Sequence, residues 1–177
     1  MIKMYLCGSV KLWRSEFKER YSTSFGTSIQ LFEPGSMNVP QNQMHINPDI
    51  ALFDVQQIQE ADALLVYMKN YESNYEVDGP VGTDSSWECG YGYGLKKPII
   101  TIIEDLEHLK YFQLQWMVTF TISTFITDNE EVLNVIQNDD RLKKIGCILY
   151  KPERNIEYMI TEYLKTSQSQ QPLRQQL

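Results

Sequence analysis

The sequence contains few cysteines and few histidines, and this shortage argues against disulfide and zinc frameworks. The three cysteines, Cys7, Cys89 and Cys147, lie far apart in a chain of 177 residues, and their odd number does not suit a disulfide framework. The two histidines are isolated, and no spacing of Cys and His matches a zinc site. We therefore expect no metal. Cys7 and Cys147 lie in apolar runs, so we expect both to be buried, reduced thiols.

Long apolar runs are also missing. No run approaches the roughly 20 residues that a membrane-spanning helix needs. The first residues, Met1–Leu6, lack the long apolar segment and the cleavage site of a secretion signal. The sequence therefore predicts a cytoplasmic protein without a membrane partner.

Positive charge is scarce. Lys and Arg number 16 against 23 Asp and Glu, the formal net charge is −7, and no basic cluster is longer than two residues. A nucleic-acid partner requires a face of Lys and Arg that neutralises phosphates, so we expect no nucleic acid. A small ligand remains compatible with this charge, because one or two well-placed cations hold a single phosphate.

What the sequence does contain is an alternation of short apolar runs with helical patterns. Its composition, 42% hydrophobic and 22% charged, is ordinary for a globular protein. The alternation predicts an α/β fold, a doubly wound (Rossmann- or flavodoxin-like) parallel sheet of about five strands with helices on both faces. In such folds ligands bind beyond the carboxyl ends of the strands. We expect one domain over residues 1–165 and a disordered tail over residues 166–177.

The individual elements follow from these runs. The expected strands are Lys3–Cys7, Ile29–Phe32, Ala63–Met68, Ile99–Ile103 and Cys147–Tyr150. The expected helices are Leu12–Tyr21, Pro48–Ala61, Ser85–Leu95, Asp128–Gln137 and Ile156–Lys165, and Asp128 with Glu131 resembles a capping box. Residues 109–126 show no pattern that divides them into elements.

Asp54 is unusual because it falls on the apolar stripe of its expected helix. It lies four residues from both Ile50 and Ile58, which mark the inward face. An acid on such a face needs a partner or a cavity. The position fits either a catalytic carboxylate or one that bonds a nearby loop.

Glu88 lies in the first turns of the helix expected over Ser85–Leu95. If Thr83 or Asp84 caps this helix, Glu88 sits near its positive end, where the field favours an ionised carboxylate. An ionised carboxylate is the form that a nucleophile needs. The same position also suits an ordinary first-turn Glu that stabilises the helix.

Two glycine-containing segments have different expected roles. Gly90, Gly92 and Gly94 lack the spacing of a dinucleotide-binding fingerprint, and we expect Gly90 and Gly94 to pack the helix closely on the sheet. The turn Cys7–Ser9, with Lys11 and Arg14 beyond it, fits either a phosphate site or a plain strand–helix connection.

Several segments together resemble the nucleoside 2-deoxyribosyltransferase family. Residues Tyr5–Ser9 resemble the family's opening strand and turn, and Asp54–Ala63 its helix-to-strand stretch with two acids eight residues apart. Residues Trp87–Tyr91, followed by Lys97–Pro98, resemble its nucleophile motif. Residues Gln113–Trp116 fall where family members contribute to a neighbouring subunit's site. The resemblance covers roughly residues 3 to 126, and the order and spacing of the segments carry it.

The resemblance implies an enzyme that exchanges the base of 2′-deoxynucleosides. Glu88 would attack C1′ of the sugar and form a covalent intermediate, which an incoming base displaces. Asp54 would handle the proton on the base, and Tyr5 would position Glu88. The substrate contacts that we expect are Gly8, Ser9, Asp78, Asp84, Trp87, Gln113 and Leu114.

The resemblance further implies partners and chemistry. The small-molecule partners would be a nucleoside or nucleotide and a free nucleobase, and the protein would be a homo-oligomer with shared active sites. No cofactor is required, because a carboxylate nucleophile and a proton-transferring acid suffice.

The sequence departs from the family pattern just before Glu88. The acid that binds a sugar hydroxyl usually lies six residues before the nucleophile, and here that position is Gly82. Asp84 or Asp78 would have to substitute, and we prefer Asp84. A carboxylate near O5′ repels a phosphate, so Asp84 favours nucleosides. Ser9 with Lys11 and Arg14 instead favours nucleotides. The related deoxynucleoside 5′-monophosphate N-glycosidases share the Cys-Gly-Ser turn. In them a serine before the nucleophile receives the phosphate, and Ser85 or Ser86 would take that role here.

Three hypotheses therefore stand at the level of sequence. The first is deoxyribosyl transfer between bases, and the second is hydrolysis of deoxynucleoside monophosphates or NAD-like nucleotides with the same glutamate. The third is a non-catalytic sensor of a nucleotide-derived ligand. An acid on the core-facing stripe together with a second acid at a helix start favours the enzymes, since binding alone does not require both.

Overall fold

The computed structural model of the chain describes residues 1–8, 17, 19–21, 25–33, 48–68, 83–151 and 155–170. Within this part of the chain, six strands form one parallel sheet in the order β2-β1-β3-β4-β5-β6. The strands are β1 (Ile2–Cys7), β2 (Ile29–Phe32), β3 (Ala63–Val66), β4 (Ile99–Ile102), β5 (Thr124–Thr127) and β6 (Cys147–Leu149).

The predicted α/β class is confirmed, with six strands in place of about five. The strand that the sequence did not reveal is β5, which begins inside residues 109–126 and ends one residue beyond them. Its four residues, two of them threonine, are all buried between β4 and β6. A short strand with hydroxyl side chains lacks the apolar run that marks its neighbours, so its pattern is too faint to read.

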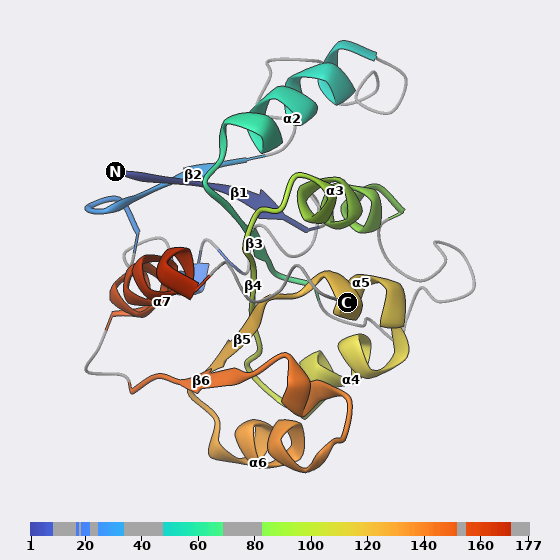
Figure 1. Cartoon of the computed structure of the whole chain (residues 1–177), viewed down its shortest axis with the longest axis vertical. Helices are drawn as coiled ribbons and strands as arrows, with labels where there is room; N and C mark the ends of the chain where they lie inside the picture. Colours follow the sequence, from blue (N-terminus) through green and yellow to red (C-terminus); the bar gives the residue numbers. More distant parts are fainter. Residues whose placement is uncertain are drawn as a thin grey trace.

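Helices cover both faces of the sheet, as predicted. Figure 1 shows α7 to the left of the sheet and α3, α4 and α5 to the right. The described helices are α2 (Pro48–Glu60), α3 (Thr83–Gly94), α4 (Leu106–Leu114), α5 (Trp116–Thr121), α6 (Glu130–Asn138) and α7 (Ile156–Gln170), with a 3₁₀ turn at Leu142–Lys144. Residues 17 and 19–21 are also helical, and the rest of the helix expected over Leu12–Tyr21 lies outside the described residues.

The order of the strands places a switch point at β1. The chain passes from β1 outward to β2, then crosses back to pair β3 on the other side of β1. Helices that follow strands on either side of such a point diverge, which leaves room for a ligand at the carboxyl ends of the strands. The end of β1 and the start of α3 are therefore where a site is expected.

Three hydrogen bonds hold α2 beside α3 and the segment that follows it. The Lys97 Nζ donates hydrogen bonds to the backbone carbonyls of Gln59 and Ala61 at the end of α2. The Gln59 Nε2 donates to the Tyr91 hydroxyl of α3 at 2.8 Å. A cation at the carboxyl end of a helix satisfies free carbonyls and complements the dipole. These bonds fix α2, and with it Asp54, relative to α3.

Some element boundaries differ from the predicted ones. Helix α6 is capped by Asn129, whose Oδ1 accepts from the backbone N–H groups of Glu131 and Val132, and not by Asp128. Helix α7 continues beyond Lys165 to Gln170. Of the thiols expected to be buried, Cys7 is buried whereas Cys147 is half-buried. In the described ranges, no helix has the length and apolar character needed to cross a membrane.

Gly92, and not Gly90 or Gly94, lets α3 approach the sheet. A Cβ at Gly92 would lie 2.8 and 2.9 Å from the two methyl carbons of Leu64 on β3, whereas a Cβ at Gly90 or Gly94 would meet nothing within 4 Å. The expectation that Gly90 and Gly94 form the packing face was wrong, because the helix presents the intervening glycine to β3.

We predict opposite effects of alanine at these two helical glycines. Gly92→Ala forces Leu64 to move in a fully buried core and should cost about 1 to 3 kcal/mol. Gly90→Ala fills open space and restricts the unfolded chain, so it should stabilise by up to about 1 kcal/mol. Urea denaturation of both variants measures the difference. Equal stability of the two would contradict the close approach at Gly92.

Candidate active site

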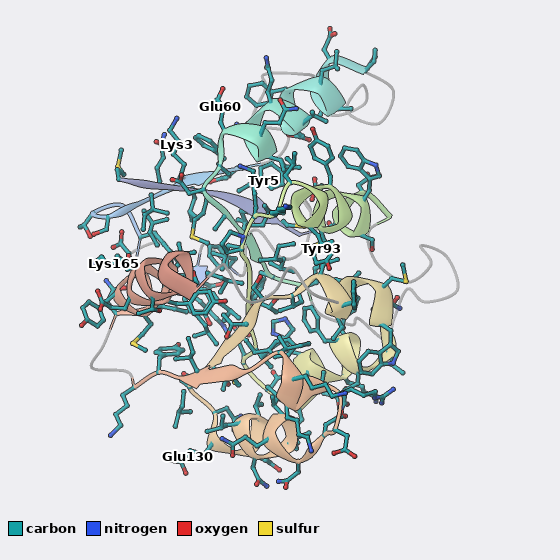
Figure 2. The ribbon with its side chains drawn as sticks, viewed as in Figure 1. Lys3, Tyr5, Glu60, Tyr93, Glu130 and Lys165 are labelled. Atoms are coloured by element: carbon teal, nitrogen blue, oxygen red, sulfur yellow. The ribbon has the colours of Figure 1, made fainter. Side chains whose placement is uncertain are left out.

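Glu88 is held between two side chains of β1. The Tyr5 hydroxyl donates to Glu88 Oε1 at 2.6 Å, and the Cys7 thiol donates to Glu88 Oε2 at 3.1 Å. Tyr5 and Cys7 lie two residues apart on a strand, so both point to the same face of the sheet. Figure 2 places Tyr5 between β1 and α3. Each carboxylate oxygen therefore has its own donor from the strand.

This contact is buried. Glu88 is 7% exposed, and Tyr5 and Cys7 are both 0% exposed. A carboxylate removed from water needs hydrogen bonds to its charged form, and here both donors are neutral groups. The arrangement binds the carboxylate without neutralising it.

The surroundings of Glu88 raise its pKa to about 7 from an ordinary value of 4.5. Burial is the largest cause, because it disfavours the charged form. The hydrogen bonds from Tyr5 and Cys7 oppose this rise, while the charges of Asp54 and Asp84 add to it. Glu88 therefore gains or loses a proton much closer to neutral pH than an exposed glutamate does.

Both donors keep their protons in this environment. Burial, and then the charges of Glu88 and Asp54, raise the pKa of the Tyr5 hydroxyl well above its ordinary value. Burial, and then the neighbouring thiol of Cys89, raise the pKa of the Cys7 thiol. Tyr5 and Cys7 thus remain hydrogen-bond donors whenever Glu88 is ionised.

A second buried glutamate shows the opposite behaviour. Glu157 on α7 is 3% exposed and accepts hydrogen bonds from the Thr27 hydroxyl and from the backbone N–H groups of Ser28 and Ile29. Burial alone would raise its pKa, but these hydrogen bonds outweigh burial and lower the pKa. Glu157 ties α7 to the start of β2. By contrast, the local environment of Glu88 makes its ionisation costly, which is a mark of functional carboxylates.

Two further acids act on Glu88 through their charges. Asp54 on α2 is half-buried, and its neighbours Ile50 and Ile58 on the predicted stripe are buried. Asp84 is exposed in the first turn of α3. It does not cap this helix, because α3 begins at Thr83. The structure thus brings together Glu88, Tyr5, Asp54 and Asp84 from β1, α2 and α3.

The remaining predicted contacts are spread over the molecule. Trp87 is 54% exposed and its ring stacks on Tyr91 at 5.1 Å between centroids. Gly8 lies half-buried just after β1. Gln113 and Leu114 end α4, which packs on α5 and α6. Ser9 and Asp78 lie outside the described residues.

Cys7 is the site residue that the sequence did not assign as a partner of Glu88. We expected only a buried thiol, although its position two residues after Tyr5 already placed both side chains on one face. That alternation was the available signal. No group of three or more His, Cys, Asp or Glu side chains suited to a metal ion occurs among the described residues.

Comparisons with known proteins identify similar folds. No protein-family model and no curated protein matches the chain. The chain is similar to the solved structure of a 2-deoxyribosyltransferase from the psychrotolerant bacterium Bacillus psychrosaccharolyticus, with a TM-score of 0.47, 17% sequence identity, and coverage of 84% of this chain and 99% of that chain. It is also similar to FerB, a flavoenzyme NAD(P)H:(acceptor) oxidoreductase from Paracoccus denitrificans, with a TM-score of 0.39, 9% identity, and coverage of 94% and 92%. Both TM-scores lie below 0.5, so neither similarity bears on function.

The raised pKa of Glu88 predicts a stability that depends on pH. The folded pKa lies above the unfolded value, so the contribution of Glu88 is fully present below pH 4.5 and is lost as pH rises through about 7. Glu88→Gln does not titrate, and its stability relative to the parent chain should rise over that window. Above pH 7 the free energy of unfolding should exceed that of the parent chain by at most about 3 kcal/mol. The gain is smaller to the extent that the amide forms weaker hydrogen bonds with Tyr5 and Cys7. Thermal unfolding at pH 4 and pH 8 measures it.

Glu157→Gln is the matched control for this measurement. Because the folded pKa of Glu157 is lowered, its contribution is present above the unfolded pKa and is lost as pH falls. This variant should therefore be destabilised at pH 8. A Glu88→Gln variant that loses stability at pH 8 in the same way would show that Glu88 is a structural acid.

Proposed function

We propose that this protein exchanges the base of 2′-deoxynucleosides through a covalent deoxyribosyl intermediate on Glu88. The observation that carries the proposal is the buried Glu88 carboxylate, held by Tyr5 and Cys7 and flanked by Asp54 and Asp84. The sequence resemblance to nucleoside 2-deoxyribosyltransferases supports the same assignment, because its motif residues lie close together here. Tyr5 is hydrogen-bonded to Glu88, and the charge of Asp54 raises the pKa of both.

The first half-reaction forms a sugar ester. An ionised oxygen of Glu88 attacks C1′, the new O–C1′ bond forms, and the C1′–N bond breaks with its electron pair passing to the base. Asp54 enters this step in its protonated form and transfers its proton to the departing base, which leaves a carboxylate. A nucleophile whose pKa is about 7 is both available in its ionised form at neutral pH and a reasonable leaving group later.

The second half-reaction reverses these steps with another base. A nitrogen of the incoming base attacks C1′, the ester bond breaks, and the electron pair returns to Glu88. Asp54 accepts the proton that the incoming base loses. Tyr5, which keeps its proton, holds one Glu88 oxygen throughout both steps.

The charge of the site favours nucleosides over nucleotides. The charge of Asp84 lies close enough to Glu88 to raise its pKa, and this carboxylate would repel a phosphate. We assign Asp84 to a sugar hydroxyl, and Gly8 and Trp87 to further substrate contacts. Ser9, Lys11 and Arg14, which would favour a phosphate, lie outside the described residues, as does Asp78.

We also propose that the protein is a homo-oligomer with shared active sites. Leu114, Met117 and Phe120 on α4 and α5 are 55%, 85% and 69% exposed, and the Phe120 ring meets Tyr93 of α3 at 5.4 Å between centroids. Figure 2 shows Tyr93 on the side of α3 that faces α5. Apolar side chains gathered on one surface are typical of an interface. On this proposal Gln113 and Leu114 contribute to the neighbouring subunit's site.

The remaining expectations stay part of the proposal. They are a single domain over residues 1–165, a cytoplasmic location, a reaction that needs no cofactor, and a free nucleobase as second substrate without nucleic acid as a partner.

Incubation with deoxyinosine and cytosine should yield deoxycytidine, measured by liquid chromatography. Glu88→Ala should lower this exchange by about a thousandfold or more, and Asp54→Asn by about a hundredfold or more. Glu162→Ala, which changes an exposed glutamate on α7, is the control and should retain full activity. Full exchange by Glu88→Ala would refute the proposal.

Parallel incubations with deoxynucleoside monophosphates and with NAD separate the alternatives. Free base released from phosphorylated substrates alone would assign the protein as a nucleotide N-glycosidase instead. Stabilisation by nucleotides with no turnover at any protein concentration would assign it as a sensor.

A further inference from the structure

The Cys7 thiol contacts three groups at the base of the candidate site. It donates to Glu88 Oε2 at 3.1 Å, and it lies 3.3 Å from the backbone carbonyl of Ser85 and 3.6 Å from the Cys89 sulfur. Cys7, Glu88 and Cys89 are all buried. A thiol enclosed in this way has no water with which to exchange its hydrogen bond.

Two oxygen acceptors lie within reach of the Cys7 thiol, so the thiol can give up its hydrogen bond to Glu88 and donate to Ser85 instead. A thiol carries a single proton, so it donates fully to either Glu88 or Ser85. When the Glu88 oxygen becomes protonated or part of a sugar ester, it is a poorer acceptor, and the proton turns to the Ser85 carbonyl. Because that second acceptor is already within reach, the change leaves no buried donor without a partner.

Tyr5 and Cys7 also differ in strength as donors. The Tyr5 bond to Oε1 is short at 2.6 Å, whereas a thiol is a weak donor and its bond to Oε2 is 3.1 Å long. A weak bond stabilises the ionised carboxylate while removing little of the electron density on the oxygen that it contacts. Oε2 is therefore the oxygen with the greater freedom to react.

We propose that Cys7 is a positioning residue that holds Glu88 ionised and oriented for attack, and releases Oε2 to the sugar by turning its thiol to the Ser85 carbonyl. This inference rests on the proposed function. It extends that proposal by assigning Oε2 as the attacking atom and Oε1, which stays on Tyr5, as the carbonyl oxygen of the ester.

Four named side chains from three elements act on the pKa of Glu88. Strand β1 contributes Tyr5 and Cys7, helix α2 contributes Asp54, and helix α3 contributes Asp84. The two carboxylates raise the pKa of Glu88, and the two donors lower it. Removing the Cys7 donor should therefore raise it further, with the remaining three groups unchanged.

The titration of Glu88 tests this directly. The chain is labelled with glutamate carrying ¹³C at the side-chain carboxyl, and the Glu88 signal is identified by its absence in Glu88→Gln. Cys7→Ala should raise the titration midpoint of Glu88 by about one pH unit. Cys7→Ser restores a donor and should bring the midpoint back to or below that of the parent chain. Cys89→Ala is the matched control, since it removes another buried thiol that does not donate to Glu88, and should leave the midpoint in place.

The pH profile of base exchange gives the second readout. Exchange requires ionised Glu88, so the acidic limb of the profile should move up by about one unit in Cys7→Ala. At pH values on the acidic limb the exchange rate of Cys7→Ala should fall about tenfold, and on the plateau, where only the orienting contact is lost, it should fall by less. An unchanged midpoint in Cys7→Ala, or an equal shift in Cys89→Ala, would overturn the role of Cys7. A shifted midpoint in a protein that exchanges no base would instead reject the proposed function and leave the coupling of Cys7 to Glu88 intact.

Discussion

A carboxylate that is only 7% exposed must be held by donors, and in this chain the donors are the neutral side chains of Tyr5 and Cys7. Had Arg or Lys occupied their places, Glu88 would form an ion pair with a lowered pKa and little reactivity. Here burial, and then the charges of Asp54 and Asp84, raise its pKa to about 7, and the hydrogen bonds from the neutral donors offset only part of this rise. The candidate chemistry depends on this balance, in which the carboxylate is bound firmly but its charge is not cancelled.

The fold supplies the geometry for that balance. Parallel pairing of β1 with β3 fixes the register of the strands and so places Tyr5 beside Leu64 and Cys7 beside Val66. The close approach of Gly92 to Leu64 lets α3 pack near the same strands, so the first turns of α3 deliver Glu88 to β1. The bonds from Lys97 and Gln59 hold α2 beside α3. A site assembled from three elements thus depends on a few contacts between them.

Much of this arrangement could be predicted from the sequence, because it follows from local pattern. The strand Ile29–Phe32 is found at its predicted bounds, and the apolar run at residues 99–103 marks β4 within one residue. Asp54 on an apolar stripe and Glu88 at a helix start were both recognisable. Strand β5 was not, because a threonine at each end leaves only two apolar residues between them.

The contacts between elements could not be predicted from the local sequence pattern. The role of Cys7 depends on which turn of α3 faces β1, a relation between residues 81 positions apart. The packing glycine was misassigned for the same reason, since the rotation of α3 on the sheet decides between Gly90 and Gly92. The opposite pKa shifts of Glu88 and Glu157 likewise arise from partners that only the fold brings near.

The most direct test of the account is to trap the covalent intermediate. The protein is mixed with a deoxynucleoside in the absence of acceptor base, quenched in acid, and measured by intact and peptide mass spectrometry. Covalent catalysis by Glu88 predicts a mass increase of one deoxyribosyl group on the peptide that contains Glu88, and its loss when a free base is added before the quench. Turnover without this adduct, or an adduct on a different residue, would contradict it.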